Sequence, residues 1–316
     1  MSSSSKKLFI SEDRNLPRAL RHILNMLDLT LYMVAKGWRI KPQYIHAHDT
    51  LVLPAATILS VVCGSILVYD AHELESDKNG QNSFMRHGTF AIEKICWPRV
   101  NKFITVSESI QNWYFNRFSE KDSEIIFNSP VNSNFECTDY LREHFSIEQS
   151  ARVFIYIGYL SKGRGINHML KAFSEPDTLN HIVFLGDGRL KGQILQYGQT
   201  FKNIHHHDPV EHSEVVKIAS SADVGLCLIE NISVSDYFSL PNKLFEYLFS
   251  GLKVIGSDFP EIRRVLLEHN AGITCENSSE ALREALSSVD ITEKTGDLSF
   301  LSWDYQETKL KDLYQR

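Results

Sequence analysis

Short apolar runs alternate with amphipathic segments along most of the chain, and this alternation restricts the fold more than any other feature. The first runs lie near residues 44–49, 65–69, 102–106 and 124–127, and helical patterns separate them. A second series follows at 153–157, 181–185, 224–228 and 253–256. Strands that alternate with helices form βαβ units and a mostly parallel sheet. The sequence therefore predicts an α/β protein with two Rossmann-like domains and a cleft between them.

Polar residues follow several of these apolar runs. In the first series they are His48 and Asp49 after one run, and His72 and Glu73 after the next. Ligands of open parallel sheets bind outside the carboxyl ends of the strands. We therefore expect these side chains to lie at the ligand-binding edge of the first domain.

The second series carries a glycine-rich, basic loop between a strand and a helix. This loop runs over 158–165 and contains Gly158, Lys162 and Arg164. Glycines allow close backbone approach to a phosphate, and the cations complement its charge. The loop matches neither GxxxxGK[ST] nor GxGxxG, so alone it is a weak signal.

The stretch 237–259 indicates a nucleotide-sugar site. Pro241, Asn242 and Lys243 stand at a predicted helix start, and Glu246 follows one turn later. A helix start offers free N–H groups and the positive end of the helix dipole, which suit a phosphate. Lys243 adds a positive charge, and Glu246 can accept hydrogen bonds from sugar hydroxyls.

Composition excludes several other classes of protein. The 316 residues suffice for two domains, and the net charge of -6 argues against a nucleic-acid partner for the molecule as a whole. The five cysteines form no CxxC pair, which favours reduced thiols in the cytosol over a disulfide framework. The chain shows no signal-peptide pattern and no apolar run of about 18 residues, so we expect a cytoplasmic protein.

A basic helix near the N-terminus leaves two interpretations open. We expect Met1–Lys7 to be disordered and a helix to follow, with Asn15 as its cap, Pro17 in its first turn and a stop at Gly37. Its first half carries a basic face, which consists of Arg14, Arg18, Arg21 and His22. Such a face either binds the inner face of an anionic membrane or is simply solvated.

The three consecutive histidines His205–His207 invite a metal interpretation, which we reject. Consecutive residues in a strand point to opposite faces, so three in a row rarely share one ion. The sequence predicts no metal site.

The second series resembles the donor domain of GT-B glycosyltransferases of family 4. The resemblance rests on segments in the family's order, namely 156–165, 184–188, 222–226, 239–247 with Gly251 and 254–255, and 302–304. It implies that Glu246 holds the donor ribose and that the backbone of Leu240–Lys243 faces the diphosphate. Arg164 takes the family's lysine position and would neutralise the leaving phosphate, with Lys162 in support, while Gly186 and Asp187 line the nucleotide side.

The first domain resembles the family's acceptor domain at residues 45–49 and 69–73. His72 matches the histidine beside the donor sugar and reaction centre, which makes it the catalytic candidate. His48, Asp49 and Glu73 are candidates for the acceptor side.

Two departures from the family pattern affect the expected function. Phe238 stands where the family has a glutamate that contacts the donor sugar. No glycine precedes Gly37, so the first domain looks shortened at its N-terminus.

The resemblance implies a retaining hexosyltransferase that moves a sugar from a nucleotide-sugar, most simply UDP-linked, to a glycan or lipid-linked glycan. A role in surface polysaccharide or capsule biosynthesis follows, with no metal or other cofactor. We expect an acceptor-side domain at 1–135, a donor domain at 150–300 and a helix at 301–316 that crosses back to the first domain. The alternative is a catalytically impaired homologue that serves as a partner subunit of a polysaccharide assembly complex.

Overall fold

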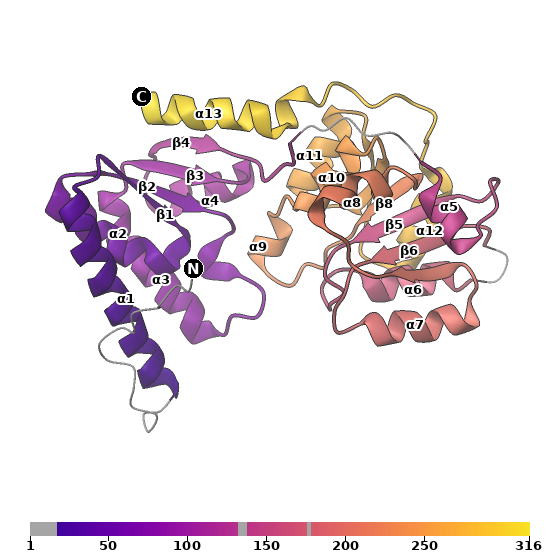
Figure 1. Cartoon of the computed structure of the whole chain (residues 1–316), viewed down its shortest axis with the longest axis horizontal. Coiled ribbons are helices and arrows are strands. Elements are labelled where there is room, and N and C mark those ends of the chain that lie inside the picture. Colours follow the sequence, from indigo (N-terminus) through magenta and orange to yellow (C-terminus); the bar gives the residue numbers. More distant parts are fainter. Residues whose placement is uncertain (1–17, 132–137, 176–177) are drawn as a thin grey trace, which may run out of the picture. The chain divides into compact units, whose positions relative to one another are not determined.

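The computed structural model describes residues 18–131, 138–175 and 178–316, and the chain divides into two compact units (Figure 1). Unit 1 contains the described residues up to Thr105 together with Gln111–Ile125. Unit 2 contains Val106–Ile110 and the described residues from Ile126 to Arg316. Each unit has an entirely parallel sheet, which confirms the predicted α/β class.

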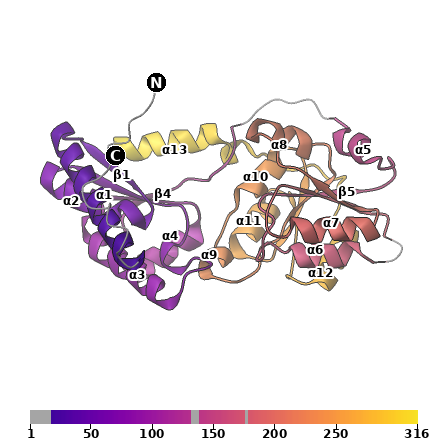
Figure 2. The ribbon, with the colours of Figure 1, turned by 60° about the horizontal axis from the view of Figure 1, so that its bottom comes forward.

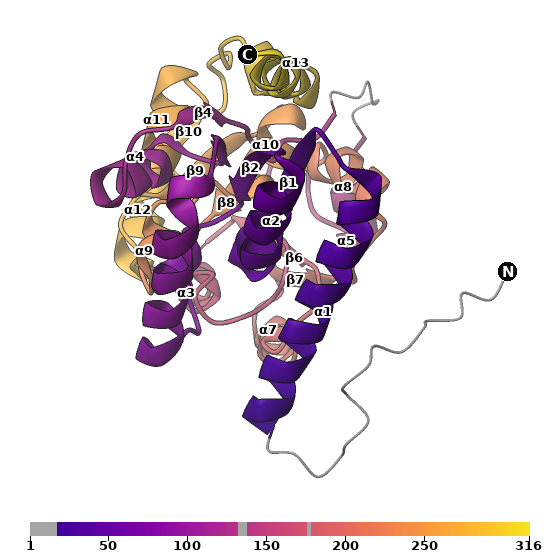
Figure 3. The same ribbon diagram turned by 90° about the vertical axis from the view of Figure 1, so that its left-hand side faces the viewer.

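The N-terminal part of the chain builds a four-stranded sheet in the order β1-β2-β3-β4. Its strands are β1 (Tyr44–His48), β2 (Ile66–Ala71), β3 (Lys102–Thr105) and β4 (Asp122–Ile125). Its helices are α1 (Arg18–Ile40), α2 (Asp49–Cys63), α3 (Ser83–Cys96) and α4 (Glu108–Arg117), with the 3-10 turns η1 (Glu75–Asp77) and η2 (Trp97–Arg99). Helix α2 lies between α1 and α3 (Figure 3).

One predicted boundary in this part is wrong. Gly37 does not end α1, which continues to Ile40 and is followed by Lys41 at a positive φ of 49°. Gly37 instead packs against Leu59 of α2, where a Cβ atom would overlap the leucine side chain. Helix α3 begins at Ser83, because the Asn82 side chain caps it by accepting the Met85 N–H at 2.9 Å.

Some N-terminal predictions lie outside the described residues. They are the disorder of Met1–Lys7, the cap at Asn15, Pro17 in the first turn and the basic side chain of Arg14.

Unit 2 holds a six-stranded sheet in the order β10-β9-β8-β5-β6-β7. Its strands are β5 (Val153–Ile157), β6 (His181–Leu185), β7 (Ile204–His207), β8 (Val224–Cys227), β9 (Lys253–Ser257) and β10 (Gly272–Cys275). Its helices are α5 (Tyr140–Phe145), α6 (Ile166–Phe173), α7 (Lys191–Thr200), α8 (His212–Ala219), α9 (Val234–Tyr237), α10 (Asn242–Phe249), α11 (Pro260–Glu268), α12 (Ser279–Ser288) and α13 (Trp303–Gln315), with the 3-10 turn η3 (Ser299–Leu301).

Alternate residues of β5 pack into two separate cores of unit 2. Val153, Ile155 and Ile157 face α8, α10 and α11, whereas Phe154 and Tyr156 face α6, α7 and α12. Figure 2 shows these two helix layers on opposite sides of β5. Because both faces are covered, the strands read as continuous apolar runs, which is why the sequence locates them well.

Residues 138–149, which include the short helix α5, belong to unit 2. Leu141 of α5 is fully buried in its core. The Arg142 guanidinium donates to Asp223 at 2.7 Å, and the same carboxylate oxygen accepts the Val153 N–H at 2.6 Å. Helix α5 is therefore tied to the start of β5 and does not act as a spacer.

Candidate functional site

Helix α10 begins where the sequence predicted a phosphate-binding helix start. Pro241 is its N-cap in an extended conformation, and the Leu244 N–H bonds to the Pro241 carbonyl at 3.0 Å. The cap makes no side-chain hydrogen bond to the first turn. The first N–H groups of α10 are therefore available to an anion.

Two glycines follow the neighbouring strands β5 and β6. Gly158 has a φ of 126° and Gly186 a φ of 148°, and the Gly158 N–H bonds to the Leu185 carbonyl at 3.0 Å. A Cβ atom on Gly186 would overlap the Gly158 carbonyl oxygen. Glycine is needed at 186 so that the two strand ends can approach each other.

These loops and α10 enclose a cavity of about 570 Å³ within unit 2. Eight of the ten predicted donor residues line it: Gly158, Arg164, Gly186, Asp187, Pro241, Asn242, Lys243 and Glu246. The structure thus brings together residues from three separate segments of the sequence.

Two predicted donor residues do not line this cavity. Leu240 is buried in the apolar core against α10, so its side chain supports the helix start from behind. Lys162 is exposed and lies outside the residues that line the cavity. Of the cations predicted in the glycine-rich loop, only Arg164 reaches the cavity wall.

Sequence reasoning missed other residues of the cavity wall. They are Tyr156, Ile157, Tyr159, Leu185, Pro209, Val210, His212 and Val215. Most belong to, or adjoin, the strand ends of β5, β6 and β7, so the strand register could have pointed to them.

Lys243 is held over an aromatic ring. Its ammonium nitrogen lies 3.7 Å from the centroid of the Tyr156 ring and faces Gly158. Among the described residues the buried Lys243 Nζ has no hydrogen-bond partner. A buried cation with unused donors is suited to an anionic ligand.

Glu246 shares the cavity with this cation. Its side chain is only 12% exposed, and His212 Nδ1 lies 3.8 Å from its carboxylate. Burial raises the pKa of Glu246, and the positive charges of His212 and Lys243 oppose that rise. Glu246 also lines a second cavity of about 530 Å³, which extends to Asn128–Val131 and Trp303.

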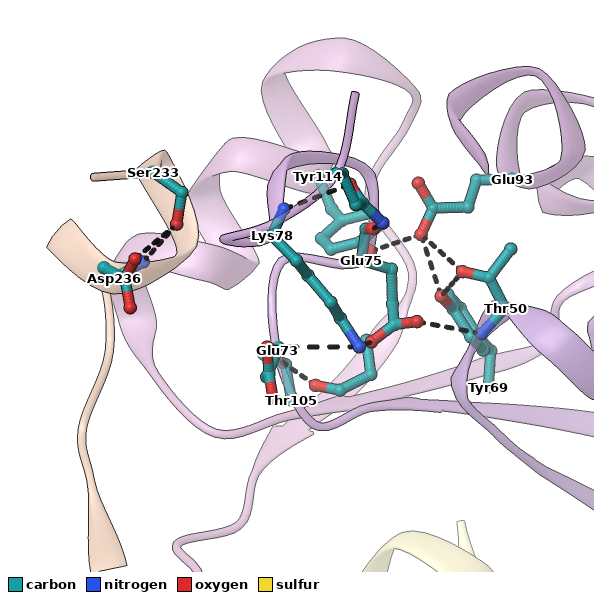
Figure 4. Close-up of polar contacts among 12 residues, drawn as sticks. Thr50, Tyr69, Glu73, Glu75, Lys78, Glu93, Thr105, Tyr114, Ser233 and Asp236 are labelled. Atoms are coloured by element: carbon teal, nitrogen blue, oxygen red, sulfur yellow. Dashed lines mark hydrogen bonds and ion pairs between the residues drawn. The ribbon is translucent and has the colours of Figure 1, made fainter. Parts of the chain in front are cut away.

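Phe238, which replaces the expected sugar-binding glutamate, is not among the residues that line the cavity. Shortly before it in the sequence, Asp236 of α9 accepts a hydrogen bond from the Ser233 hydroxyl at 2.8 Å (Figure 4). Burial raises the pKa of Asp236, while the Ser233 hydrogen bond and the charge of Arg164 lower it. Asp236 therefore interacts electrostatically with Arg164 of the cavity wall.

In unit 1 the candidates His48 and His72 lie together. The two strands align His48 with Asp70, and His48 Nδ1 lies 3.0 Å from His72 Nε2. Asp70 and His46 join them, with His46 Nε2 at 3.0 Å from Asp70 Oδ2. Burial lowers the pKa of His48, and neighbouring His46 lowers it further. The sequence candidates did not include His46 or Asp70.

The candidates Asp49 and Glu73 make different contacts. Asp49 opens α2 at a φ of 63°, and its charge acts on buried Glu75. The exposed Glu73 carboxylate lies 4.0 Å from the Lys78 ammonium, which is itself ion-paired with Glu75 (Figure 4).

Unit 1 also contains a buried carboxylate, Glu93, that was not among the sequence candidates. Glu93 of α3 is fully buried and accepts hydrogen bonds from the hydroxyls of Thr50, Tyr69 and Tyr114 (Figure 4). Burial raises the pKa of Glu93, and the three hydroxyls oppose that rise. This network links α2, β2, α3 and α4, so it is a structural element of unit 1.

Known structures define the class of fold. Sucrose-phosphate synthase from Thermosynechococcus elongatus aligns with a TM-score of 0.75 at 14% identity, over 98% of this chain and 82% of that chain. HepE of Anabaena, solved in complex with UDP-glucose, aligns with a TM-score of 0.68 at 15% identity, over 92% of this chain and 81% of that chain. The protein has the GT-B glycosyltransferase fold, as the resemblance predicted.

Residues 151–289, which lie in unit 2, match the family described as glycosyl transferases group 1. The chain is also 24% identical over 251 residues to TuaC of Bacillus subtilis, a glycosyltransferase named for teichuronic acid biosynthesis. That match covers 78% of this chain and 61% of the relative's length. In the described part of the chain, none of the helices combines the length and apolar character that a membrane span requires.

Proposed function

We propose that the protein is a glycosyltransferase that transfers a hexose from a nucleotide-sugar, UDP-linked, to a glycan or lipid-linked glycan acceptor. The match to the group 1 family supports transfer from an activated sugar. UDP is supported by HepE, which was solved with UDP and with UDP-glucose. The relative named for teichuronic acid biosynthesis supports a product in surface polysaccharide or capsule biosynthesis.

The convergence of Arg164, Lys243 and Glu246 on one cavity at the start of α10 carries this proposal. In a transfer reaction the departing diphosphate gains negative charge, and fixed cations and N–H groups stabilise that charge. Arg164, Lys243 and the first turn of α10 supply these groups. Glu246 accepts hydrogen bonds from the ribose hydroxyls and so orients the donor. With these cations in place, the donor site needs no metal.

The acceptor side belongs to unit 1 in this proposal. His72 acts beside the donor sugar, and His48, Asp49 and Glu73 contact the acceptor. We propose retention of the anomeric configuration, as for family 4. We keep the domain assignment of 1–135 for the acceptor side and 150–300 for the donor side, with 301–316 as the crossover helix.

We also propose that the protein works at the inner face of the membrane through the basic helix that contains Arg14–Arg21. Arg14 and the side chains of this helix start lie outside the described residues. Binding to anionic liposomes at low salt, lost in an Arg18→Glu, Arg21→Glu variant, would support the contact. Equal binding by the variant would exclude it.

The donor site is tested by calorimetric titration of UDP into the full chain. We expect Glu246→Ala to weaken UDP binding by about 10-fold or more, because a hydrogen bond to a charged carboxylate contributes about 1.5–3 kcal/mol. Glu284→Ala, at an exposed helical glutamate of α12, is the matched control and should bind as the wild type does. Unchanged affinity in Glu246→Ala would refute the site.

Phe238 favours a second candidate function, a catalytically impaired homologue that acts as a partner subunit of a polysaccharide assembly complex. Phenylalanine cannot accept the sugar hydrogen bonds that the family's glutamate accepts. The two functions separate in an assay with a panel of nucleotide-sugars. UDP binding without hydrolysis or transfer of any donor would support the partner subunit, whereas turnover would support the enzyme.

A further inference from the structure

Four side chains that bind metals in many proteins converge at the carboxyl ends of β1 and β2. His46 and His48 alternate along β1, so they point to one face of the sheet. The strand register sets Asp70 of β2 beside His48, and His72 follows Asp70 by two residues. Parallel partners and i, i+2 neighbours share a face, which explains why these four side chains meet.

Their donor atoms lie close together, although the rings are stacked, His46 on His48 and His48 on His72, each pair at an interplanar angle of 14°. Asp70 Oδ2 lies 3.0 Å from His46 Nε2, 3.4 Å from His48 Nδ1 and 3.8 Å from His72 Nε2. His48 Nδ1 and His72 Nε2 are 3.0 Å apart. Zinc–ligand bonds of about 2.0–2.1 Å place tetrahedral ligands about 3.3 Å from one another, which falls within the range of these four spacings. The stacked rings would rotate to aim their nitrogens at one ion.

We propose that His46, His48 and Asp70 form a binding site for a zinc-class divalent cation, with His72 beside it. In the described part of the chain, this set is the one group of three such residues whose donor atoms all lie within 4.8 Å of one another. This proposal differs from the sequence analysis, which predicted no metal site.

Each donor atom of this cluster has a polar contact, but the two contacts of His48 Nδ1 compete for one proton. His48 Nδ1 faces both Asp70 Oδ2 and His72 Nε2, yet a ring nitrogen carries at most one proton and can donate it to only one of them. A cation at the centre would be bound by both nitrogens and the carboxylate at once. Imidazole nitrogen and carboxylate oxygen are the ligands that zinc takes in proteins.

Burial and access also suit an exchangeable ion. The Asp70 side chain is 12% exposed, so its negative charge is shielded from water and acts strongly on a nearby cation. The His48 side chain is 59% exposed, which leaves a path for the ion. The histidines of β7 lack this geometry, because His205 pairs with His181 and His206 bonds to the Gly186 carbonyl.

The test is titration of Zn²⁺ into the untagged, chelator-treated full chain, with calorimetry for stoichiometry and Co²⁺ absorption for geometry. We expect one high-affinity ion per chain and the intense visible bands of tetrahedral Co²⁺. Asp70→Asn and His46→Ala should each weaken Zn²⁺ binding by about 100-fold or more, while His72→Ala keeps a weaker site. His87→Ala, at a histidine of α3 bonded to the Ser83 carbonyl, is the matched control and should bind as the wild type does.

Folding is monitored separately, because a ligand variant can lose binding by unfolding. Zn²⁺ should raise the unfolding temperature of the wild type and of His87→Ala, but not that of Asp70→Asn. His48→Ala, at a largely exposed side chain, gives a second variant that is expected to fold. The proposal is overturned if the wild type binds no stoichiometric Zn²⁺, or if folded Asp70→Asn and His48→Ala bind it as tightly as the wild type. UDP binding is measured in unit 2 and is independent of this result.

Discussion

Lys243 is expected to lower the stability of the ligand-free protein but to strengthen UDP binding. Replacing it with methionine should therefore change these two quantities in opposite directions. The Lys243 ammonium is buried at 3.7 Å from the Tyr156 ring, and among the described residues it has no hydrogen-bond partner. Such a group stabilises a folded chain less than an apolar side chain of similar length would. In this interpretation, Lys243 is retained because a bound nucleotide diphosphate accepts hydrogen bonds from its ammonium group.

The magnitude follows from two opposing terms. Removing a buried ammonium with unused donors relieves about 1–3 kcal/mol, and losing the contact with the Tyr156 ring costs about 0.5–2 kcal/mol. We therefore expect Lys243→Met to stabilise the ligand-free protein by about 1 kcal/mol, which raises its unfolding temperature by about 2–4 °C. The same variant should bind UDP about 10- to 150-fold more weakly, because a charged hydrogen bond contributes about 1.5–3 kcal/mol.

The assay combines thermal unfolding with and without UDP and calorimetric titration of UDP. Lys217→Met, at an exposed lysine of α8, is the control and should change neither quantity by much. A Lys243→Met protein that is less stable without UDP, or that binds UDP as the wild type does, would refute the reasoning.

Three further predictions test other parts of the structure. Gly186→Ala should lower the free energy of unfolding by at least about 2 kcal/mol and abolish UDP binding, because the added Cβ would overlap the Gly158 carbonyl and residue 186 has a φ of 148°. Thermal unfolding and calorimetric titration of UDP measure the two effects. The control is Gly192→Ala in α7, where the added Cβ meets open space. Tyr114→Phe should lower the free energy of unfolding by about 1–2 kcal/mol, because buried Glu93 loses one of three hydroxyl donors, and Tyr32→Phe at an exposed tyrosine should have no effect in denaturant titration. Burial lowers the pKa of His205 to about 4, below the ordinary value of 6.5. Its contribution to stability is therefore present above pH 6.5 and is lost as the pH falls towards about 4, and His205→Gln should flatten that part of the pH–stability curve.

The sequence predicted the fold well where local patterns decide it. The strands Val153–Ile157 and His181–Leu185 lie where their apolar runs placed them. Errors arose where tertiary contacts override a local signal. Gly37 reads as a helix stop, but its missing side chain is needed for packing against Leu59.

The two candidate sites differ in how far the sequence could reveal them. In unit 2 the glycine loops and the start of α10 are local motifs, and Glu246 lies one turn from Asn242, so a linear reading finds them. The cluster in unit 1 depends on the register between β1 and β2. That register places Asp70 beside His48, and the sequence pattern within either strand does not predict the register. His46 and Asp70 were missed for this reason.

The charges of the unit 2 cavity indicate which part of a nucleotide-sugar it recognises best. Its wall carries the cations Arg164 and Lys243 beside the start of α10, and these match a diphosphate. Glu246 is one of two carboxylates in that wall, and it is fixed to α10 by its place in the helix. Phe238 removes the acid that the family offers to the sugar, while Asp236 is buried and occupied by Ser233. The same cavity should therefore bind UDP and UDP-sugars with similar affinity, because the phosphates and ribose, and not the sugar hydroxyls, make the contacts that this wall provides.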